Sequence, residues 1–183
     1  MGREIRGAVR EEDVSRRFKP PAWALWPPMR VLPKDKKARQ EVARRWGELI
    51  FDWASATGRV VVDLAELSET PPFDLPADLL RSAAEHLVRT GRAKWREKGR
   101  SLLVFWRSRH SWAKAIYSWL KENFKEVFSL HDLMEADEAF SQLPPEELKA
   151  CLKLLEKSGL VKKVKRVKGY YKLMVPGLSL IHI

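Results

Sequence analysis

An internal duplication constrains this sequence more than any other feature. The segment WGELIFDWA at 46–54 returns 66 positions later as WAKAIYSWL at 112–120, and VVDLAEL at 61–67 returns at the same offset as VFSLHDL at 127–133. A third pair, LPADLLRSAAEHLVRTGRAK at 75–94 and LPPEELKACLKLLEKSGLVK at 143–162, is offset by 68 positions. Three matching blocks in the same order predict two copies of one folding unit.

Each copy begins with two predicted helices. Apolar residues at helical spacing indicate a first helix over about 37–56, and again over about 110–125. Asp63 and Ser129 each precede a Leu-x-acid-Leu turn. Both residue types accept hydrogen bonds from the free N–H groups of a first helical turn, so each is predicted to be the N-cap of a short second helix.

The remainder of each copy predicts one more helix and a β-hairpin. The third helix follows a proline and ends at Gly91 or Gly159, each placed as the C′ residue. Two short strands follow, turning at 98–100 in one copy and at 168–169 in the other. These strands are expected at 93–97, 101–107, 161–167 and 169–175. Three helices and a hairpin wing predict an α+β, mainly α chain of two tandem winged-helix domains.

These elements set the expected domain boundaries. An N-terminal tail and a proline/tryptophan leader occupy 1–36, the first winged-helix domain 37–107 and the second 108–175. The last segment, 176–183, is expected to be a non-native tail, because LSLIHI resembles a translated library adaptor.

Charge and cysteine content narrow the classes of function. The net charge is +11, and basic residues exceed acidic ones in 1–50 and 91–183 but not in 51–90. This excess either attracts a polyanion or serves solubility alone. One cysteine excludes a disulfide framework, and no apolar run approaches the roughly 18 residues of a membrane span. A reducing, cytoplasmic location is therefore expected.

Specific DNA binding is disfavoured, although it is the commonest use of this fold. The third helices begin PADLLR and PPEELK, so Asp78, Glu146 and Glu147 stand where base-reading cations are expected. The second wing is nevertheless basic. It contains the residues assigned here as candidate anionic contacts: Lys162, Lys163, Lys165, Arg166 and Lys168. The alternative is a solvated strand edge protected from aggregation by its lysines.

No enzymatic motif is found in the sequence. It contains no glycine-rich phosphate loop, nucleophile elbow, paired carboxylates or metal-ligand spacing, so no catalytic residue, metal or cofactor is predicted. His86, His110 and His131 are expected to pack or cap helices, and Cys151 to fill the core. A scaffold that presents surfaces to partners is the remaining class.

Several stretches resemble one family. AKWREKGRSLLVFWRSRHSWAKAIYSWL, the FSLHDL turn and AFSQLPPEEL are similar to the vacuolar protein-sorting-associated protein 25 family, the small subunit of the ESCRT-II complex. Upstream, WPPMRVLPKDKKARQEVARRW resembles the proline-rich leader of the same family and the start of its first helix. The resemblance covers about 20–174.

The resemblance implies a structural role in endosomal (multivesicular body) protein sorting and membrane remodelling. In this family the chain docks onto two larger winged-helix subunits through Pro-Pro-x-aromatic motifs, and its second domain binds the N-terminal helix of an ESCRT-III subunit. Peripheral recruitment to endosomal or other membranes follows from that role. The runner-up reading is a basic tandem winged-helix transcriptional regulator that binds DNA, and direct lipid recruitment by the basic wings is compatible with the family role.

The family motif carries over to the leader only in part. Pro20, Pro21 and Trp23 fit the first docking motif, but Arg30 stands where the second requires an aromatic residue. The candidate docking residues are therefore Pro20, Pro21, Trp23, Trp26, Pro27, Pro28 and Met29. The alternative is that Trp23 and Trp26 fold back onto the first winged helix.

For the ESCRT-III helix, the resemblance and the pattern together suggest an exposed edge of the second copy. Its candidate residues are Phe128, Leu130, His131, Phe140, Lys149 and Lys153. Phe128 and Phe140 occupy positions that are also typical of core residues, so both readings stay open.

Overall fold

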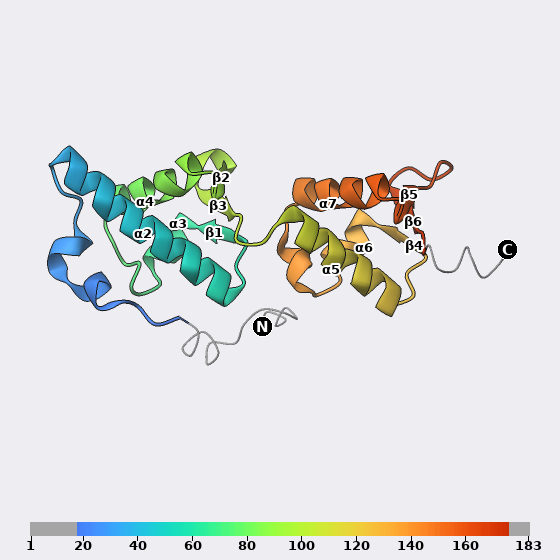
Figure 1. The fold of residues 1–183 in the computed structure, drawn as a ribbon, viewed down its shortest axis with the longest axis horizontal. Coiled ribbons are helices and arrows are strands. Elements are labelled where there is room, and N and C mark those ends of the chain that lie inside the picture. The colour runs from blue at the N-terminus through green and yellow to red at the C-terminus, as the bar shows by residue number, and fades with distance from the viewer. Residues whose placement is uncertain (1–17, 176–183) are drawn as a thin grey trace. The chain divides into compact units, whose positions relative to one another are not determined.

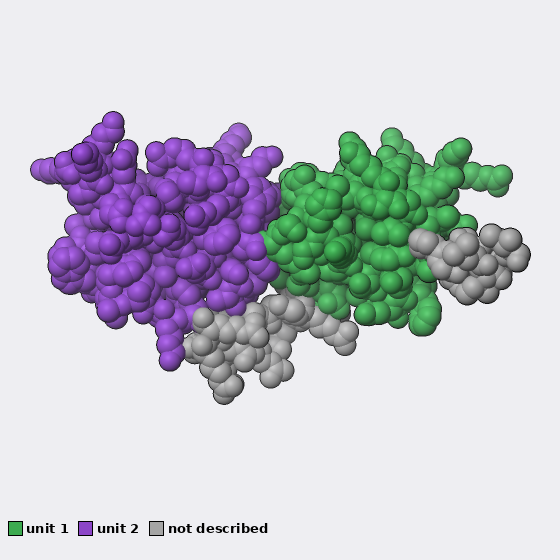
Figure 2. All heavy atoms as spheres, viewed as in Figure 1, with its two compact units in different colours: residues 1–7, 107–183 green, residues 8–106 purple. Residues whose placement is uncertain are grey.

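The computed structural model describes residues 18–175, which form two compact units divided between Trp106 and Arg107 (Figures 1 and 2). We call the described residues up to Trp106 the first unit and those from Arg107 the second unit. The predicted tail at 176–183, and all of the N-terminal tail before Phe18, lie outside the described residues.

The first unit is built on two long helices that pack against one another. Helix α2 (Lys36–Thr57) buries Trp46, Ile50 and Trp53 against α4 (Ala77–Arg89), and α3 (Leu64–Ser68) lies between them in the chain (Figure 1). Gly47 permits this close approach, because a Cβ at Gly47 would lie 2.8 Å from the carbonyl oxygen of Ala83.

The second unit repeats this arrangement. Its helices are α5 (Arg109–Glu122), α6 (Leu130–Met134) and α7 (Pro145–Lys157), with a 3₁₀ turn, η4 (Ala139–Gln142), before α7. Trp112, Ile116 and Leu120 of α5 are buried, and α5 packs on α7. Both copies thus bury the aromatic and aliphatic stripe that the duplicated sequence predicts.

The predicted helix caps are confirmed. The Asp63 carboxylate accepts hydrogen bonds from the N–H groups of Ala65 and Glu66 at the start of α3. Ser129 and Asp132 form a reciprocal capping box at the start of α6. These local bonds satisfy N–H groups that a helix leaves free at its first turn.

Each unit has a small antiparallel sheet of three strands, one more than the predicted hairpin. The strands of the first sheet are β1 (Val61–Asp63), β2 (Ala93–Arg96) and β3 (Ser101–Val104), in the order β1-β3-β2, with η3 (Glu97–Gly99) in the wing. Those of the second are β4 (Val127–Ser129), β5 (Val161–Lys163) and β6 (Tyr170–Leu173), in the order β4-β6-β5. The extra strand precedes each second helix and pairs with the inner strand, which places Val62 and Phe128 in the core.

The four long helices end in the same hydrogen-bonded motif. In each, two successive N–H groups bond back to the last turn, and the C′ residue is left-handed. Glycine occupies C′ after α2, α4 and α7, at Gly58, Gly91 and Gly159, with φ between 73° and 75°. After α5 the C′ residue is Phe124, with φ 52°. The predicted helix ends at Gly91 and Gly159 are thereby confirmed. The three helices and the small sheet of each unit confirm the predicted tandem winged-helix fold.

Candidate partner-docking surfaces

The proline/tryptophan leader is folded into two 3₁₀ turns. They are η1 (Ala22–Leu25) and η2 (Pro27–Arg30). The N–H of Ala24 donates to the carbonyl of Pro21 at 3.0 Å, and the N–H of Met29 donates to the carbonyl of Trp26 at 2.9 Å. Proline fixes φ near −65° and restricts the residue before it, so these turns cost less ordering entropy than they would in a flexible segment.

Trp46 of α2 holds the leader onto the first unit. Its indole Nε1 donates a hydrogen bond of 2.6 Å to the carbonyl of Met29, and the ring of Trp23 meets it edge-on with centroids 5.0 Å apart. Trp46 is fully buried. An edge-to-face pair of aromatic rings contributes about 0.5–1.5 kcal/mol beyond the burial of its area.

Arg30 is the second anchor of the leader. Its guanidinium donates to the carbonyls of Ala24 at 2.9 Å and Pro72 at 3.1 Å, and to the Asp74 carboxylate at 2.8 Å. It also lies 6.0 Å from the centre of the Trp46 ring. The residue that departs from the family motif therefore ties the second diproline turn to its own chain.

These contacts divide the predicted docking residues into two groups. Trp23 packs against the core of the first unit, as the alternative of folding back requires, and Met29 packs there as well. Trp26 remains 58% exposed, and Pro20, Pro27 and Pro28 are exposed as well. Two further apolar side chains close to Trp26 in the sequence, Leu25 and Val31, are exposed as well. Sequence reasoning missed both, although each lies within three residues of a diproline.

The edge predicted to receive an ESCRT-III helix lacks its two aromatic side chains. Phe128 and Phe140 are buried, so of the two readings left open by the sequence the core position is the one the structure shows, and neither ring lies on an exposed edge. The Phe128 ring stacks on Tyr171 with centroids 5.7 Å apart, and Phe140 packs against Trp119. Phe128 lies in β4 and Phe140 in η4, and both rings are part of the buried core of the second unit.

The other residues predicted for that edge are accessible. Leu130 is half-buried, His131, Lys149 and Lys153 are exposed, and the imidazole of His131 lies 3.2 Å from the Glu135 carboxylate. Their role in binding an ESCRT-III helix stays a prediction.

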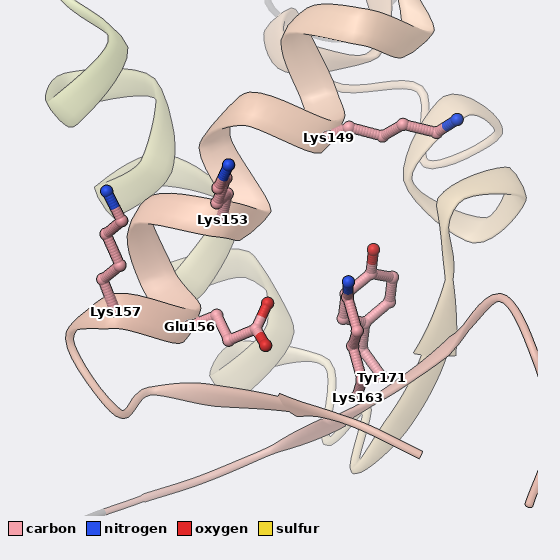
Figure 3. A pocket seen from close by; sticks show the side chains of 6 residues that line it. All are labelled: Lys149, Lys153, Glu156, Lys157, Lys163 and Tyr171. Atoms are coloured by element: carbon pink, nitrogen blue, oxygen red, sulfur yellow. The ribbon is translucent and has the colours of Figure 1, made fainter. Parts of the chain in front are cut away.

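A hollow of about 440 Å³ lies between α7 and the strands of the second sheet (Figure 3). We call it the lysine hollow. It is lined by Lys149, Lys153, Glu156, Lys157, Lys163 and Tyr171. Lys163 and Tyr171 project side by side from the sheet, and the Glu156 carboxylate points from α7 toward them (Figure 3). The remaining basic residues of the wing, Lys162, Lys165, Arg166 and Lys168, are exposed.

Burial shifts the pKa of two titratable side chains among the described residues. Cys151 is buried, as predicted, and burial raises the pKa of its thiol to about 11, which disfavours a nucleophilic thiolate. Burial also lowers the pKa of the half-buried His86. Within residues 18–175 no group of three His, Cys, Asp or Glu side chains is arranged to hold a metal ion. The helices of this part of the chain are too short or too polar to cross a membrane.

The chain is similar to known proteins in sequence and in fold. Residues 25–144 match the model of the ESCRT-II complex subunit family. Vacuolar protein-sorting-associated protein 25 from Homo sapiens and from Bos taurus are each 26% identical over 145 residues, which cover 72% of this chain and 82% of the relative.

Solved structures share the fold. The crystal structure of subunit VPS25 of ESCRT-II superposes with a TM-score of 0.62 at 16% identity, covering 86% of this chain and 99% of VPS25. A chain of the endosomal complex ESCRT-II (VPS22/VPS25/VPS36) superposes with a TM-score of 0.57 at 17% identity, covering 84% and 98%. The duplicated sequence, the two winged-helix units and these matches lead to one conclusion: the chain belongs to the vacuolar protein-sorting-associated protein 25 family of ESCRT-II complex subunits.

Proposed function

We propose that this chain is a non-enzymatic structural subunit of an ESCRT-II complex that acts in endosomal (multivesicular body) protein sorting. Its partners are two larger winged-helix subunits, the counterparts of VPS22 and VPS36 in the solved complex. We further propose that it is cytoplasmic and recruited to membranes peripherally, as part of that complex. Membership of the family supports the role as an ESCRT-II subunit. The exposed residues of the leader support docking onto the larger subunits through this segment.

The observation that carries the docking proposal is the exposed Trp26 on an anchored leader. Trp26 is 58% exposed, although Met29 and Arg30 after it are hydrogen-bonded to Trp46 of α2 and to Asp74. Before it in the chain, the ring of Trp23 packs against Trp46. Leu25 and Val31, near Trp26 in the leader, are 68% and 54% exposed. Tryptophan is the most frequent interface anchor, and its removal commonly costs about 2 kcal/mol or more.

Anchoring the leader in advance lowers the cost of docking. A flexible segment loses about 1–2 kcal/mol of backbone entropy for each residue that binding orders. Here the two 3₁₀ turns, the Trp46 bond and the Arg30 contacts hold the segment before a partner arrives. The larger subunits thus meet a preorganised surface made of Leu25, Trp26 and Val31, with the exposed prolines at its border.

We also propose that the second unit bridges ESCRT-II to an ESCRT-III subunit and so contributes to membrane remodelling. The N-terminal helix of that subunit would lie along Leu130, His131, Lys149 and Lys153, without Phe128 and Phe140. An amphipathic helix fits such a face through apolar contact on one side and ion pairs on the other.

Co-expression of the full chain with the two larger ESCRT-II subunits from the same genome tests the assignment. A three-protein complex that survives size-exclusion chromatography is expected. A chain that elutes alone, and that binds a DNA duplex with strong salt dependence, would instead support the regulator. An ESCRT-III N-terminal helix is then titrated into the purified complex, where binding is expected and its absence would remove the bridging role.

A further inference from the structure

The lysine hollow gathers positive charge that the described structure does not neutralise. Lys149, Lys153 and Lys157 follow one another at i, i+4 and i+8 along α7, and Lys163 faces them from β5 (Figure 3). Among the described residues, none of these four ammonium groups forms an ion pair, and the Glu156 carboxylate is not paired either. Four cations and one carboxylate give the hollow a net positive charge. The ammonium groups repel one another at this spacing, and a bound anion would relieve that repulsion.

The winged-helix fold does not require these lysines. The offset of 68 places Arg81, Glu85 and Arg89 of α4 where Lys149, Lys153 and Lys157 stand in α7. Strand register places Trp95 and Leu102 where Lys163 and Tyr171 pair. In the first unit Arg81 stacks over the ring of Trp95 at 5.6 Å, and Leu102 is fully buried. The first unit thus forms the same fold with Glu85 at the position of Lys153 and Trp95 at the position of Lys163.

The shape and surroundings of the hollow favour a small phosphorylated group over a duplex. Its volume of about 440 Å³ falls in the range of sites for small ligands, and ammonium groups bind phosphate as point charges. The adjoining wing carries exposed Lys165, Arg166 and Lys168 around Val167, which is 50% exposed. An apolar side chain among lysines suits the boundary between lipid headgroups and acyl chains.

We propose that the lysine hollow binds the phosphorylated headgroup of a membrane lipid, with the wing of the second unit lying against the bilayer surface. Lys149, Lys153 and Lys163 bind the phosphate oxygens, and the Tyr171 hydroxyl donates a hydrogen bond to the headgroup. This site is independent of the leader and of assembly with the larger subunits. Lys149 and Lys153 also belong to the face proposed for the ESCRT-III helix, so a lipid headgroup and that helix would compete for these two lysines.

Co-sedimentation of the full chain with vesicles tests the proposal. Phosphatidylcholine vesicles that contain phosphatidylinositol bisphosphate are compared with vesicles in which phosphatidylserine supplies the same total charge. We expect binding to the phosphorylated lipid to be about tenfold tighter or more. Equal binding to both would show general attraction to negative charge and would overturn a headgroup site.

Two double variants with equal charge locate the contact. Lys153→Gln/Lys163→Gln is expected to weaken vesicle binding roughly 25-fold, because a basic residue near an anionic surface contributes about fivefold. Lys114→Gln/Lys125→Gln, exposed elsewhere on the second unit, should weaken it less than about threefold. Equal losses in the two variants would contradict the proposal.

Three further measurements separate the headgroup from other ligands. Soluble inositol trisphosphate should compete for the hollow but bind more weakly than the vesicles, since it cannot engage the wing. Tighter binding of the soluble compound, with no retention on vesicles, would overturn the membrane role. The membrane role would also be overturned if the Lys153→Gln/Lys163→Gln variant lost its affinity for an ESCRT-III helix or a DNA duplex but kept its vesicle binding. Assembly with the larger subunits should be unchanged in this variant, so failure here leaves the docking proposal intact.

Discussion

Arg30 and Asp74, 44 positions apart in the sequence, are joined by two hydrogen bonds. The guanidinium donates to the Asp74 carboxylate at 2.8 Å and to the Asp74 carbonyl at 3.1 Å. The first bond links the leader to the segment before α4 by charge, and the second by backbone. Arg30 also donates to the carbonyl of Ala24 in the leader and to that of Pro72 in the segment before α4. Its guanidinium therefore has acceptors in both segments.

Replacing Arg30 should therefore loosen the leader. Arg30→Ala removes hydrogen bonds to three carbonyls and is expected to lower the free energy of unfolding by about 1–2 kcal/mol, since such bonds contribute about 1 kcal/mol each with partial compensation by water. Urea unfolding measures this change, and hydrogen exchange of Ala24 and Met29 reports the loosening. Arg39→Ala, exposed on α2, is the matched control. Equal stabilities of the two variants would contradict the anchoring role.

The ion pair should also make the attachment of the leader sensitive to acid. The Arg30 side chain, and to a smaller extent a backbone hydrogen bond, lowers the pKa of the Asp74 carboxyl below its ordinary value of 3.8. A carboxyl whose pKa is lower in the folded chain stabilises the fold above its unfolded pKa, and this contribution is lost as the pH falls through the folded value.

Stability of the wild type should thus fall more on acidification than that of Asp74→Asn, which has no carboxyl to protonate. Urea unfolding at about pH 6 and about pH 2 gives the comparison. The two proteins should differ at the higher pH and converge at the lower. Because Asp74 is largely exposed, the difference should shrink in high salt. A difference that persists at the lower pH would show that Asp74 acts through packing instead.

Phe124 should destabilise the fold that contains it. It occupies the left-handed C′ position that glycine fills after α2, α4 and α7, and its side chain is 88% exposed. Phe124→Gly relieves the backbone strain at the cost of little packing, and is expected to raise the free energy of unfolding by about 0.5–1 kcal/mol.

Gly159→Ala is the converse test in the same unit. No atom lies within 4 Å of the added Cβ, so any loss arises from the φ of 74° alone. A loss of about 1 kcal/mol is expected by thermal or urea unfolding. If Phe124→Gly destabilises the protein instead, the exposed ring makes contacts that the described structure lacks.

Sequence reasoning succeeded where the determinants are local. Asp63, Ser129, Gly91 and Gly159 act within a few residues of their own position, so their roles follow from residue type and spacing. The duplication added a second, independent observation of each element.

Sequence reasoning failed for elements whose structure depends on residues distant in the sequence. Strands of three residues, such as β1 and β4, show too little alternation to be recognised, and they exist because they pair with strands some 40 residues away. The sequence left Phe128 open between a surface and the core, because its partner Tyr171 cannot be inferred from local spacing. The folded leader depends on Trp46 and Asp74, and its one signal in the sequence was the anomalous Arg30.

The central claim is that an anchored leader presents Trp26 to another ESCRT-II subunit. The most direct test is the affinity of the full chain for the purified larger subunits, measured for wild type, Trp26→Ala and the control Phe105→Ala, whose ring is 39% exposed on the same unit. We predict that Trp26→Ala weakens binding about 30-fold or more with its unfolding free energy unchanged, while Phe105→Ala binds within about threefold of wild type. Wild-type affinity in Trp26→Ala would contradict the claim.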